Sequence, residues 1–287
     1  NCSEEKQIGV KVPGIKGLFV ENNAPEIAVN ANGASLSSGY YDTAPELSVD
    51  VTDLTGGKDK NAGIASITWR IGSGTKNTVK ADFDAKPTRN YTFTLNELAG
   101  KTGVFNVTFT ATDQAGNSKT KSVTVKIKSK AKTPVLTVDY MNEKLTGLAA
   151  NAEYDVRGET FTADGSGCIR MAEDWFGTDN FQISRKAYRE DLLDSDCAVC
   201  KIAARPEAPD VSVAKDETIR GKADAQLNGV TQYMEYSADG GRTWTGVHES
   251  DLKELTGDAG ILDVPAGILT VRVKATASAP HGFETEV

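Results

Sequence analysis

The sequence predicts an all-β protein built as a tandem of small β-sandwich modules. Its 287 residues exceed the roughly 100 to 150 residues of a typical domain, so two or three separate cores are expected. From residue 24 to residue 128, apolar and polar side chains alternate, which is typical of strands with one face in a core. Proline-bearing stretches at 128–134 and 203–209 interrupt the pattern and indicate linkers. We therefore predict an N-terminal extension or the end of a preceding module over 1–22, a sandwich over 23–129, a small β-rich module over 130–206 and a second sandwich over 207–287.

Composition excludes several classes of partner. The formal net charge is -8, and it is spread along the chain rather than gathered in a tail. No stripe of Lys and Arg with interleaved aromatic residues appears, which argues against nucleic acid as a partner. No apolar run approaches the roughly 20 residues of a membrane helix, so no membrane insertion is expected within this chain. Because the sequence begins Asn1-Cys2, we interpret it as a mature or excised fragment.

The first sandwich can be followed strand by strand. Each segment carries apolar residues in a single phase, so that one face enters the core. These sets are Ile27 and Val29; Leu47, Val49 and Val51; Ile67, Trp69 and Ile71; Tyr91, Phe93 and Leu95; Phe105, Val107, Phe109 and Ala111; and Val123, Val125 and Ile127. With a short strand near Thr78 to Ala81, the count is about seven strands in about 100 residues, which is typical of an immunoglobulin-like sandwich.

The connection between the last two of these strands reads Ala111-Thr-Asp113-Gln-Ala-Gly-Asn117. Gly116 supplies the positive φ that a type I turn followed by a bulge requires. The segment resembles the A-T-D-x-A-G-N hairpin of bacterial immunoglobulin-like (Big) repeats in Gram-positive cell-surface proteins. That resemblance implies a secreted or surface-bound module and says nothing about a ligand.

The middle piece resembles a short β-rich repeat of surface proteins from gut-dwelling Gram-positive bacteria. The motifs that carry the resemblance are Leu145-Thr-Gly-Leu148, Thr162-Ala-Asp-Gly165, Trp175-Phe-Gly177 and Ala204-Arg-Pro206. The resemblance covers Val135 to Pro206 and departs at Arg185 to Cys200, which is longer. Trp175 and Phe176 would point to opposite faces of a strand, so one of them is a candidate sugar-stacking or protein-binding platform. The alternative is that both pack at a module junction.

The last piece contains two recognisable patterns. Residues 267–276 repeat the spacing of glycine, apolar residues and Ala-Thr found at 103–112, which predicts a repeated sandwich strand. The residues Ser237, Asp239, Gly241, Thr243 and Trp244 fit the S-x-D-x-G-x-T-W Asp-box of sialidase propellers, a motif that stabilises a turn and does not catalyse. A propeller would carry several copies, and this chain has one. The segment from Met234 also resembles the M-E-Y-S-x-D-G-G-x-T-W hairpin of the same surface repeats. Residues 250–255 do not alternate and predict one helical turn capped by Ser250.

Four cysteines are present, at positions 2, 168, 197 and 200. In an extracellular β-protein the expected pairing is a disulfide of Cys168 with Cys197 or Cys200. The alternative is a redox or zinc site, because Cys197-Ala-Val-Cys200 has C-x-x-C spacing. A second Cys or His pair for zinc is missing from the sequence pattern.

The sequence offers no convincing catalytic set, so we expect a protein that is not an enzyme. His248 and His281 lie in polar stretches without a matched nucleophile. Carboxylate pairs such as Glu173-Asp174 and Asp194-Ser-Asp196 are more typical of solvated surfaces than of a glycosidase in a chain with 40 acidic residues. No cofactor is expected. Calcium is the alternative, through oxygen-rich loops at 53–61 and 164–167.

These observations favour a non-catalytic extracellular array of immunoglobulin-like modules that acts as a stalk or spacer and contributes to adhesion. The expected location is the cell surface or cell wall. The expected partners are other modules of the same protein, together with a host protein or glycan. The alternative is a glycan-binding accessory module of a secreted carbohydrate-active enzyme, with Trp175 as the exposed aromatic.

Overall fold

The computed structural model describes residues 22–53, 63–83, 88–213, 225–265 and 267–287. These residues form short β-strands with two single turns of 3₁₀-helix, so the all-β prediction is confirmed. The chain divides into two compact units, one made of 1–130 with 189–193 and the other of 131–188 with 194–287. One hydrophobic cluster lies in the first unit and two lie in the second. The module boundaries that we drew from the sequence stay a prediction.

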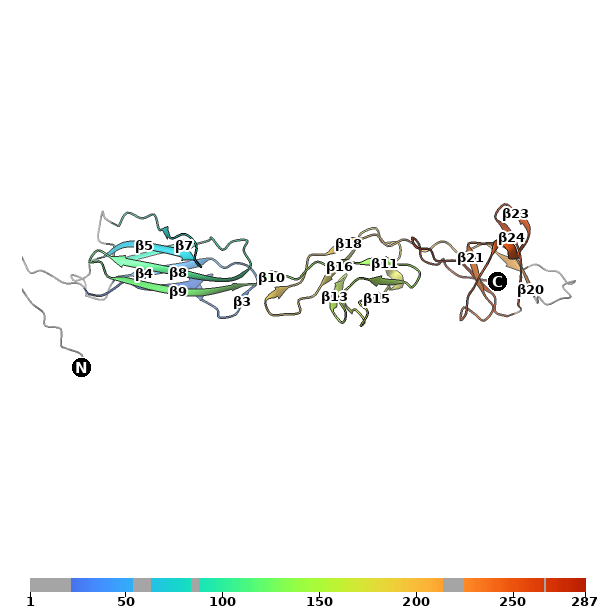
Figure 1. Ribbon diagram of the computed structural model, residues 1–287, viewed down its shortest axis with the longest axis horizontal. Helices are drawn as coiled ribbons and strands as arrows, with labels where there is room; N and C mark the ends of the chain where they lie inside the picture. Colours follow the sequence, from blue (N-terminus) through green and yellow to red (C-terminus); the bar gives the residue numbers. More distant parts are fainter. Residues whose placement is uncertain (1–21, 54–62, 84–87, 214–224, 266) are drawn as a thin grey trace, which may run out of the picture. The chain divides into compact units, whose positions relative to one another are not determined.

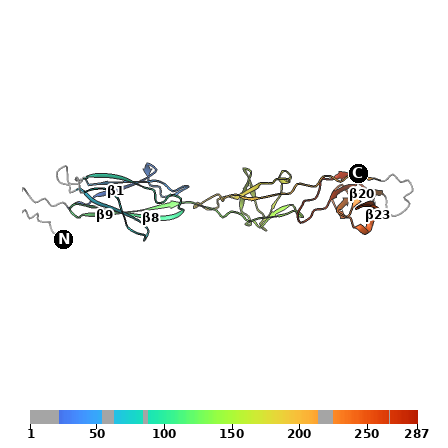
Figure 2. The ribbon, with the colours of Figure 1, turned by 90° about the horizontal axis from the view of Figure 1, so that it is seen from above.

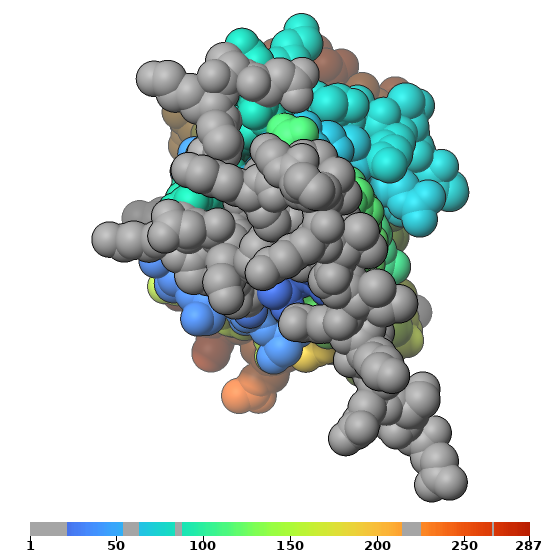
Figure 3. Space-filling model, turned by 90° about the vertical axis from the view of Figure 1, so that its left-hand side faces the viewer, coloured from blue at the N-terminus to red at the C-terminus, as the bar shows by residue number. Residues whose placement is uncertain are grey.

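The first unit is a sandwich of two sheets (Figure 1). One sheet has the order β2 (Ala34–Ser35), β1 (Glu26–Ala31), β4 (Leu47–Thr52), β7 (Asn90–Leu95). The other has the order β3 (Tyr40–Tyr41), β9 (Ser118–Ile127), β8 (Gly103–Asp113), β5 (Ile64–Ile71), β6 (Asn77–Thr78). All neighbours are antiparallel except β3 and β9. Figure 2 shows β1 in a different layer from β8 and β9, and in the end-on view of Figure 3 the blue segment of β1 and the cyan segment of β5 lie on different sides.

Alternation along the strands builds the core of this sandwich. Leu47, Val49 and Val51 are fully buried on β4, and their intervening neighbours are only half-buried. On β8 the buried apolar side chains are Val107, Phe109 and Ala111. The residues between them point outward and are not part of the core. Trp69 is half-buried and packs against the cluster from its edge. The period-two pattern therefore correctly predicted which face of each strand enters the core.

The hairpin between β8 and β9 explains the A-T-D-x-A-G-N pattern. Asp113 is buried, and its two carboxylate oxygens accept hydrogen bonds from the backbone N–H (2.7 Å) and the side-chain amide (2.8 Å) of Asn117. Gly116 adopts φ +91°, which an L-residue rarely adopts. The motif residues thus fix the geometry of a turn.

The segment where the sequence departs from the repeat pattern has a distinct role. Within 185–200, the short strand β17 (Leu192–Leu193) pairs in parallel with β10 (Ser129–Lys130) of the first unit. The backbone N–H of Ser129 also donates to the carbonyl of Asp191 at 3.0 Å. Residues 189–193 consequently belong to the first unit, although the chain on either side belongs to the second.

The second unit begins with a small pair of sheets around its own cluster. One sheet has the order β11 (Thr137–Asp139), β12 (Lys144–Thr146), β15 (Ile169–Arg170). The other has the order β14 (Glu159–Thr162), β13 (Glu153–Val156), β16 (Phe181–Arg185), β18 (Ala198–Cys200). The single 3₁₀ turn Glu173–Trp175 lies between β15 and β16. Tyr154, Phe181 and Ile202 are among the most deeply buried side chains of this cluster.

The second cluster of this unit also lies between two sheets. One has the order β19 (Ser212–Val213), β20 (Ala225–Thr231), β24 (Ala259–Val264), β23 (Leu252–Thr256), and the other has β22 (Thr245–Gly246), β21 (Met234–Ser237), β25 (Thr270–Val273), β26 (Thr285–Glu286). The strand predicted from the repeat at 267–276 is present as the shorter β25. The predicted helical turn at 250–255 is wrong in position, because a 3₁₀ turn covers Glu249–Asp251 without a side-chain cap and strand β23 follows it.

Replacing Gly116 should destabilise the first unit. In Gly116→Ala the φ of +91° becomes costly, and we expect the free energy of unfolding to fall by about 1 kcal/mol. Urea denaturation followed by the fluorescence of Trp69 measures this change. The control is Gly39→Ala, where the new Cβ would meet only the Ser37 side chain at an ordinary 3.5 Å and which should stay within about 0.5 kcal/mol of the parent. Equal losses for the two variants would contradict the argument.

Candidate functional site

Trp175 is not an exposed platform, which corrects the sequence-based interpretation. Its side chain is 2% exposed and lies between Phe161 (ring centres 5.0 Å apart) and Phe181 (4.9 Å). The residue ends a 3₁₀ turn, so the alternation of a strand that we assumed for Trp175 and Phe176 does not apply. The aromatic side chain supplies a large part of a small core.

Phe176 is half-buried and packs against the same cluster. The Arg205 guanidinium lies over its ring, with Cζ 4.0 Å from the ring centre. A cation over an aromatic face is attracted by the quadrupole of the ring. Phe176 is therefore occupied by a residue of its own chain and is not an open surface for a ligand.

Arg205 is the centre of an ionic cluster within the second unit. Its side chain is only 7% exposed. It donates a bidentate pair of hydrogen bonds to Glu173, from Nε to Oε1 (2.7 Å) and from Nη2 to Oε2 (2.8 Å). Nη1 donates to Glu143 Oε1 at 2.6 Å and to the backbone carbonyl of His281 at 3.1 Å. Every face of the guanidinium thus has a partner, as a buried charge requires.

The remaining members of this cluster come from distant parts of the chain. His281 Nε2 lies 2.8 Å from Glu143 Oε1. Glu143 is a non-glycine residue at φ +51°, a conformation that costs energy and persists where surrounding contacts determine it. The ion pair with Arg205 is such a contact. Glu143 and Glu173 accompany the first cluster of the unit, whereas His281 comes from the segment that ends the second.

Electrostatics in the cluster favour the charged forms. Burial by itself lowers the pKa of Arg205, but the hydrogen bonds to Glu173 and Glu143 raise that pKa above its ordinary value. The hydrogen bond from Arg205 holds the pKa of Glu173 below its usual range. Glu173 is therefore an ion-pair partner and lacks the raised pKa expected of a general acid.

The proline-bearing linker next to Arg205 is held along its length. The backbone N–H of Phe283 donates to the Pro206 carbonyl at 3.0 Å, and Thr285 Oγ1 donates to the Pro209 carbonyl at 2.7 Å. A Cβ added to Gly282 would approach the Pro206 carbonyl to 3.2 Å. The C-terminal segment therefore holds the linker in place through hydrogen bonds to its carbonyl groups. The sequence indicates this linker only by its prolines.

The Asp-box pattern lies on a turn that follows β21. The Asp239 carboxylate accepts hydrogen bonds from the backbone of Arg242 (3.0 Å) and Thr243 (2.9 Å) and from the hydroxyls of Ser237 and Thr243 (both 2.7 Å). Ser237 Oγ also accepts the Gly241 N–H at 2.8 Å. These bonds, that of Thr243 first, hold the pKa of Asp239 far below its ordinary value. All of these groups are used within the turn.

Trp244 completes this turn. Its indole N–H donates to the Gly241 carbonyl at 3.1 Å, and the Arg272 guanidinium lies over the ring with Cζ 3.7 Å from its centre. Arg272 in turn pairs with Glu235 at 2.7 Å. The five residues of the pattern thus make contacts with the backbone and with one another, and Trp244 contacts a cation of the same sheet.

The predicted disulfide is not formed. Cys168, Cys197 and Cys200 are free thiols in the structure. For the redox alternative, Cys197 precedes strand β18 and Cys200 ends it; at about 3.3 Å per residue in an extended strand, their Cα atoms would be about 10 Å apart, beyond the reach of the disulfide that a redox C-x-x-C motif forms. Burial raises the pKa of the Cys200 thiol, which disfavours the reactive thiolate of a redox motif. Cys2 lies outside the described residues.

The two candidate calcium loops differ in what the structure says of them. Residues 54–62 of the first lie outside the described part of the chain. In the second, Asp164 Oδ1 accepts the backbone N–H groups of Ser166 and Cys168, both at 2.9 Å, and these bonds lower the pKa of Asp164. Among the described residues, no group of three or more His, Cys, Asp or Glu side chains is arranged to hold a metal ion.

Of the candidate catalytic groups, Glu173 and His281 meet at Arg205, and the others lie elsewhere. Asp174 pairs with Arg157 at 3.3 Å, and Asp194 accepts the backbone N–H of Ala187 at 2.7 Å. His248 lies at the start of the 3₁₀ turn Glu249–Asp251, away from the Arg205 cluster in sequence and without a side-chain bond to that turn. The ionic cluster around Arg205 was the feature that sequence reasoning missed; the A-R-P motif contains its central residue but not its partners.

Comparison with known proteins finds similarity among solved structures alone. No protein-family model and no curated protein matches the chain. Similar solved structures include a Ca²⁺-stabilized adhesin of an Antarctic bacterium that binds ice (16% identity, 93% of this chain and 73% of that one, TM-score 0.30). Others are the fibronectin(III)-like modules of Clostridium thermocellum CbhA (18%, 61% and 93%, 0.22) and the Bacteroides ovatus SGBP-B of a mixed-linkage glucan utilization locus (13%, 92% and 69%, 0.23). This chain itself is an all-β array of small two-sheet sandwiches.

None of the helices in the described ranges combines the length and the apolar character that a bilayer span requires.

Removing the charge of Asp239 should lower the melting temperature of the second unit. In Asp239→Asn the acceptor for the Thr243 hydroxyl is lost, so the turn is held less firmly. Because the pKa of Asp239 is lowered in the folded state, its contribution is complete above the unfolded pKa of about 4 and is lost as the pH falls below that value. Circular dichroism melting curves at pH 7 and at decreasing pH measure the difference between parent and variant.

Asp258→Asn is the matched control for that measurement. Asp258 is exposed in the turn between β23 and β24 of the same sandwich. Its replacement should leave the melting temperature unchanged at every pH. A difference between Asp239→Asn and the parent that stays constant from pH 7 to pH 2 would contradict the assignment.

The Arg205 cluster should make a large contribution to the stability of the second unit. Arg205→Lys removes the bidentate geometry towards the exposed Glu173 and leaves the mostly buried Glu143 with a poorer partner, so the free energy of unfolding should fall by about 1 to 2 kcal/mol. Denaturation followed by the fluorescence of Trp175, next to Phe176, reports the change. Arg157→Lys is the control, because its exposed pair with Asp174 should contribute less than about 0.5 kcal/mol. A loss in the control as large as in Arg205→Lys would refute this ranking.

Proposed function

We propose that the chain is a non-catalytic part of a bacterial surface protein, in which immunoglobulin-like and fibronectin-III-like modules act as a stalk or spacer and contribute to adhesion. The observation that carries this proposal is that the most distinctive polar side chains make hydrogen bonds and ion pairs within the fold. Asp113, Asp164 and Asp239 each accept hydrogen bonds inside their own turn, and Arg205 is enclosed by Glu143 and Glu173. Groups that are committed to folding in this way do not supply a free acid, base or nucleophile.

The assignment to Gram-positive cell-surface proteins is supported by the sequence motifs. The A-T-D-x-A-G-N and M-E-Y-S-x-D-G-G-x-T-W hairpins resemble those of surface repeats, and in this chain both are closed turns held by an aspartate. Their location outside the cell, at the surface or attached to the wall, is part of the same proposal. So is the expectation that the neighbouring modules of the full protein are partners.

The accessory glycan-binding alternative loses its original support. It depended on an exposed Trp175, and that side chain is buried between two other aromatic rings. A glycan-binding role now needs a different surface.

A display experiment tests the spacer function. The chain is inserted between a cell-wall anchor and an epitope on a Gram-positive host, and antibody binding to intact cells is compared with that of the epitope fused directly to the anchor. We expect stronger antibody binding with the chain present, because serial folded modules hold the epitope away from the wall polymers. Equal binding in the two strains would contradict a spacer role. Turnover of chromogenic glycosides by the purified chain would contradict the non-catalytic part of the proposal.

A further inference from the structure

The outer face of the five-stranded sheet in the first unit carries an array of hydroxyl groups. Outward residues of β8 and β9 form three cross-strand pairs. These are Thr108 with Ser122 (3.0 Å), Thr110 with Thr120 (3.1 Å) and Thr112 with Ser118 (2.8 Å). Neighbouring strands lie about 4.8 Å apart and successive outward residues about 6.8 Å apart, so the hydroxyls form a regular grid. Each hydroxyl keeps acceptor capacity after its cross-strand bond.

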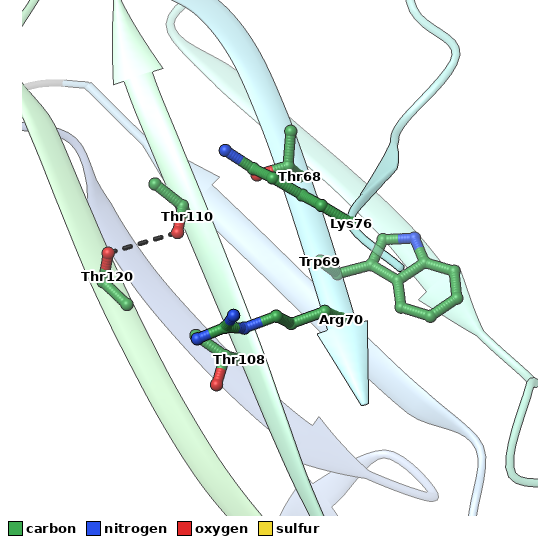
Figure 4. A pocket seen from close by; sticks show the side chains of 7 residues that line it. All are labelled: Thr68, Trp69, Arg70, Lys76, Thr108, Thr110 and Thr120. Carbon is green, nitrogen blue, oxygen red and sulfur yellow. Dashed lines mark hydrogen bonds between the residues drawn. The ribbon is translucent and has the colours of Figure 1, made fainter. Parts of the chain in front are cut away.

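A shallow open groove of about 240 Å³ crosses this face (Figure 4). It is lined by four threonines and two cations, namely Thr68, Thr108, Thr110, Thr120, Arg70 and Lys76, and by Trp69 of β5. Arg70 reaches over β8 towards Thr108, while Lys76 lies beside Thr68 (Figure 4). No acidic side chain lines the groove.

The two cations of the groove belong to the described cations that have no carboxylate partner. Lys128, Arg205 and Arg272 each pair with a carboxylate. In the part of the chain that the structure covers, neither Arg70 nor Lys76 forms an ion pair, and both are exposed. In a chain of net charge -8, two neighbouring cations without acidic neighbours form a local positive field. That field is complementary to an anionic ligand.

We propose that this groove binds an acidic polysaccharide, a glycan chain that carries carboxylate or sulfate groups. Arg70 matches the planar or multidentate geometry of such a group, and Lys76 adds a second charge. The threonine hydroxyls offer donors and acceptors to the sugar hydroxyls between the charged groups. A shallow, polar groove on a flat sheet suits an extended, hydrated chain better than an enclosed small molecule, whose sites are deep and mostly apolar.

A polysaccharide fits this surface better than a nucleic acid. Single-stranded nucleic acid is held by a longer cationic track together with exposed aromatic side chains on which bases stack. Trp69 is the aromatic residue of the groove, and it is packed against the core. The proposal goes beyond the spacer function and does not depend on it, so the display experiment and the binding experiment can fail separately.

Affinity electrophoresis of the whole chain tests the proposal. The gels contain polygalacturonate as the carboxylate probe, dextran sulfate as the sulfate probe, or neutral dextran. We expect retardation by at least one acidic polymer and none by dextran, with the retardation weakening as NaCl is raised. The two acidic probes distinguish the source of the negative charge.

Variants of the groove make the test specific. The double variant Arg70→Gln with Lys76→Gln should lose about tenfold or more in affinity, since each charge-assisted hydrogen bond contributes substantially. Lys101→Gln with Lys119→Gln is the matched control: both residues are exposed on the same sandwich outside the groove, and the change in net charge is identical. It should bind within about twofold of the parent.

A second variant tests the hydroxyl array independently of charge. Thr110→Val with Thr120→Val replaces both members of a hydrogen-bonded pair by side chains of the same shape, so the fold should tolerate it, as an unchanged melting temperature would verify. We expect a loss of about threefold to tenfold in affinity. The proposal is overturned by any of four results: no retardation by either acidic polymer, equal retardation by neutral dextran, equal losses in the groove and control variants, or binding of a single-stranded oligonucleotide in place of the polysaccharides.

Discussion

The fold depends on carboxylates that accept backbone N–H groups in turns. The strands are short and the cores small, so burial of apolar area alone fixes the connections weakly. Asp113, Asp164 and Asp239 lie in turns beside three different hydrophobic clusters. Each carboxylate accepts backbone hydrogen bonds from residues two to four positions later in the sequence. An ionised carboxylate accepts several such bonds at once and forms stronger ones than a neutral group. This use of Asp explains why three unrelated-looking motifs all contain Asp near glycine.

A different interaction holds the second unit together. Its two hydrophobic clusters have no buried residue in common, and hydrogen bonds link the segments that accompany them. Arg205 is bonded to carboxylates that accompany the first cluster and to the backbone of His281 from the segment that ends the second. A buried ion pair gains specificity of position, because a misplaced guanidinium would leave a buried charge without partners. The prolines restrict the backbone dihedral angles of the linker. The contacts of Arg205 and of the C-terminal segment determine the position of the linker within the unit.

Local patterns predicted the strands well and the long-range contacts poorly. Alternation identified the buried face of β4 and β8 because period-two burial is a property of the strand itself. The interpretation of Trp175 failed because a 3₁₀ turn, not a strand, contains it. The structure contains no disulfide among the three described cysteines, and cysteine spacing alone carries no information on the distance between Cys168 and the other two thiols. The partners of Arg205 were invisible, because Glu143 and His281 are 62 and 76 residues away from it in sequence.

The same residue at equivalent positions of a repeat can also be required for different physical reasons. The repeated segments 103–112 and 267–276 begin with Gly103 and Gly267, which suggested one shared role. Gly103 adopts φ +112° with open space around it, so backbone conformation requires the glycine. At Gly267 an added Cβ would lie 2.0 Å from the Ala238 carbonyl, so close packing against the Asp239 turn requires it. Core and turn requirements of this kind explain the inward and connecting positions of each module. They constrain the outward positions of β8 and β9 less. Threonine there favours the strand, and its hydroxyl pairs stabilise the sheet while they also form, beside Arg70 and Lys76, the polar surface of the proposed groove.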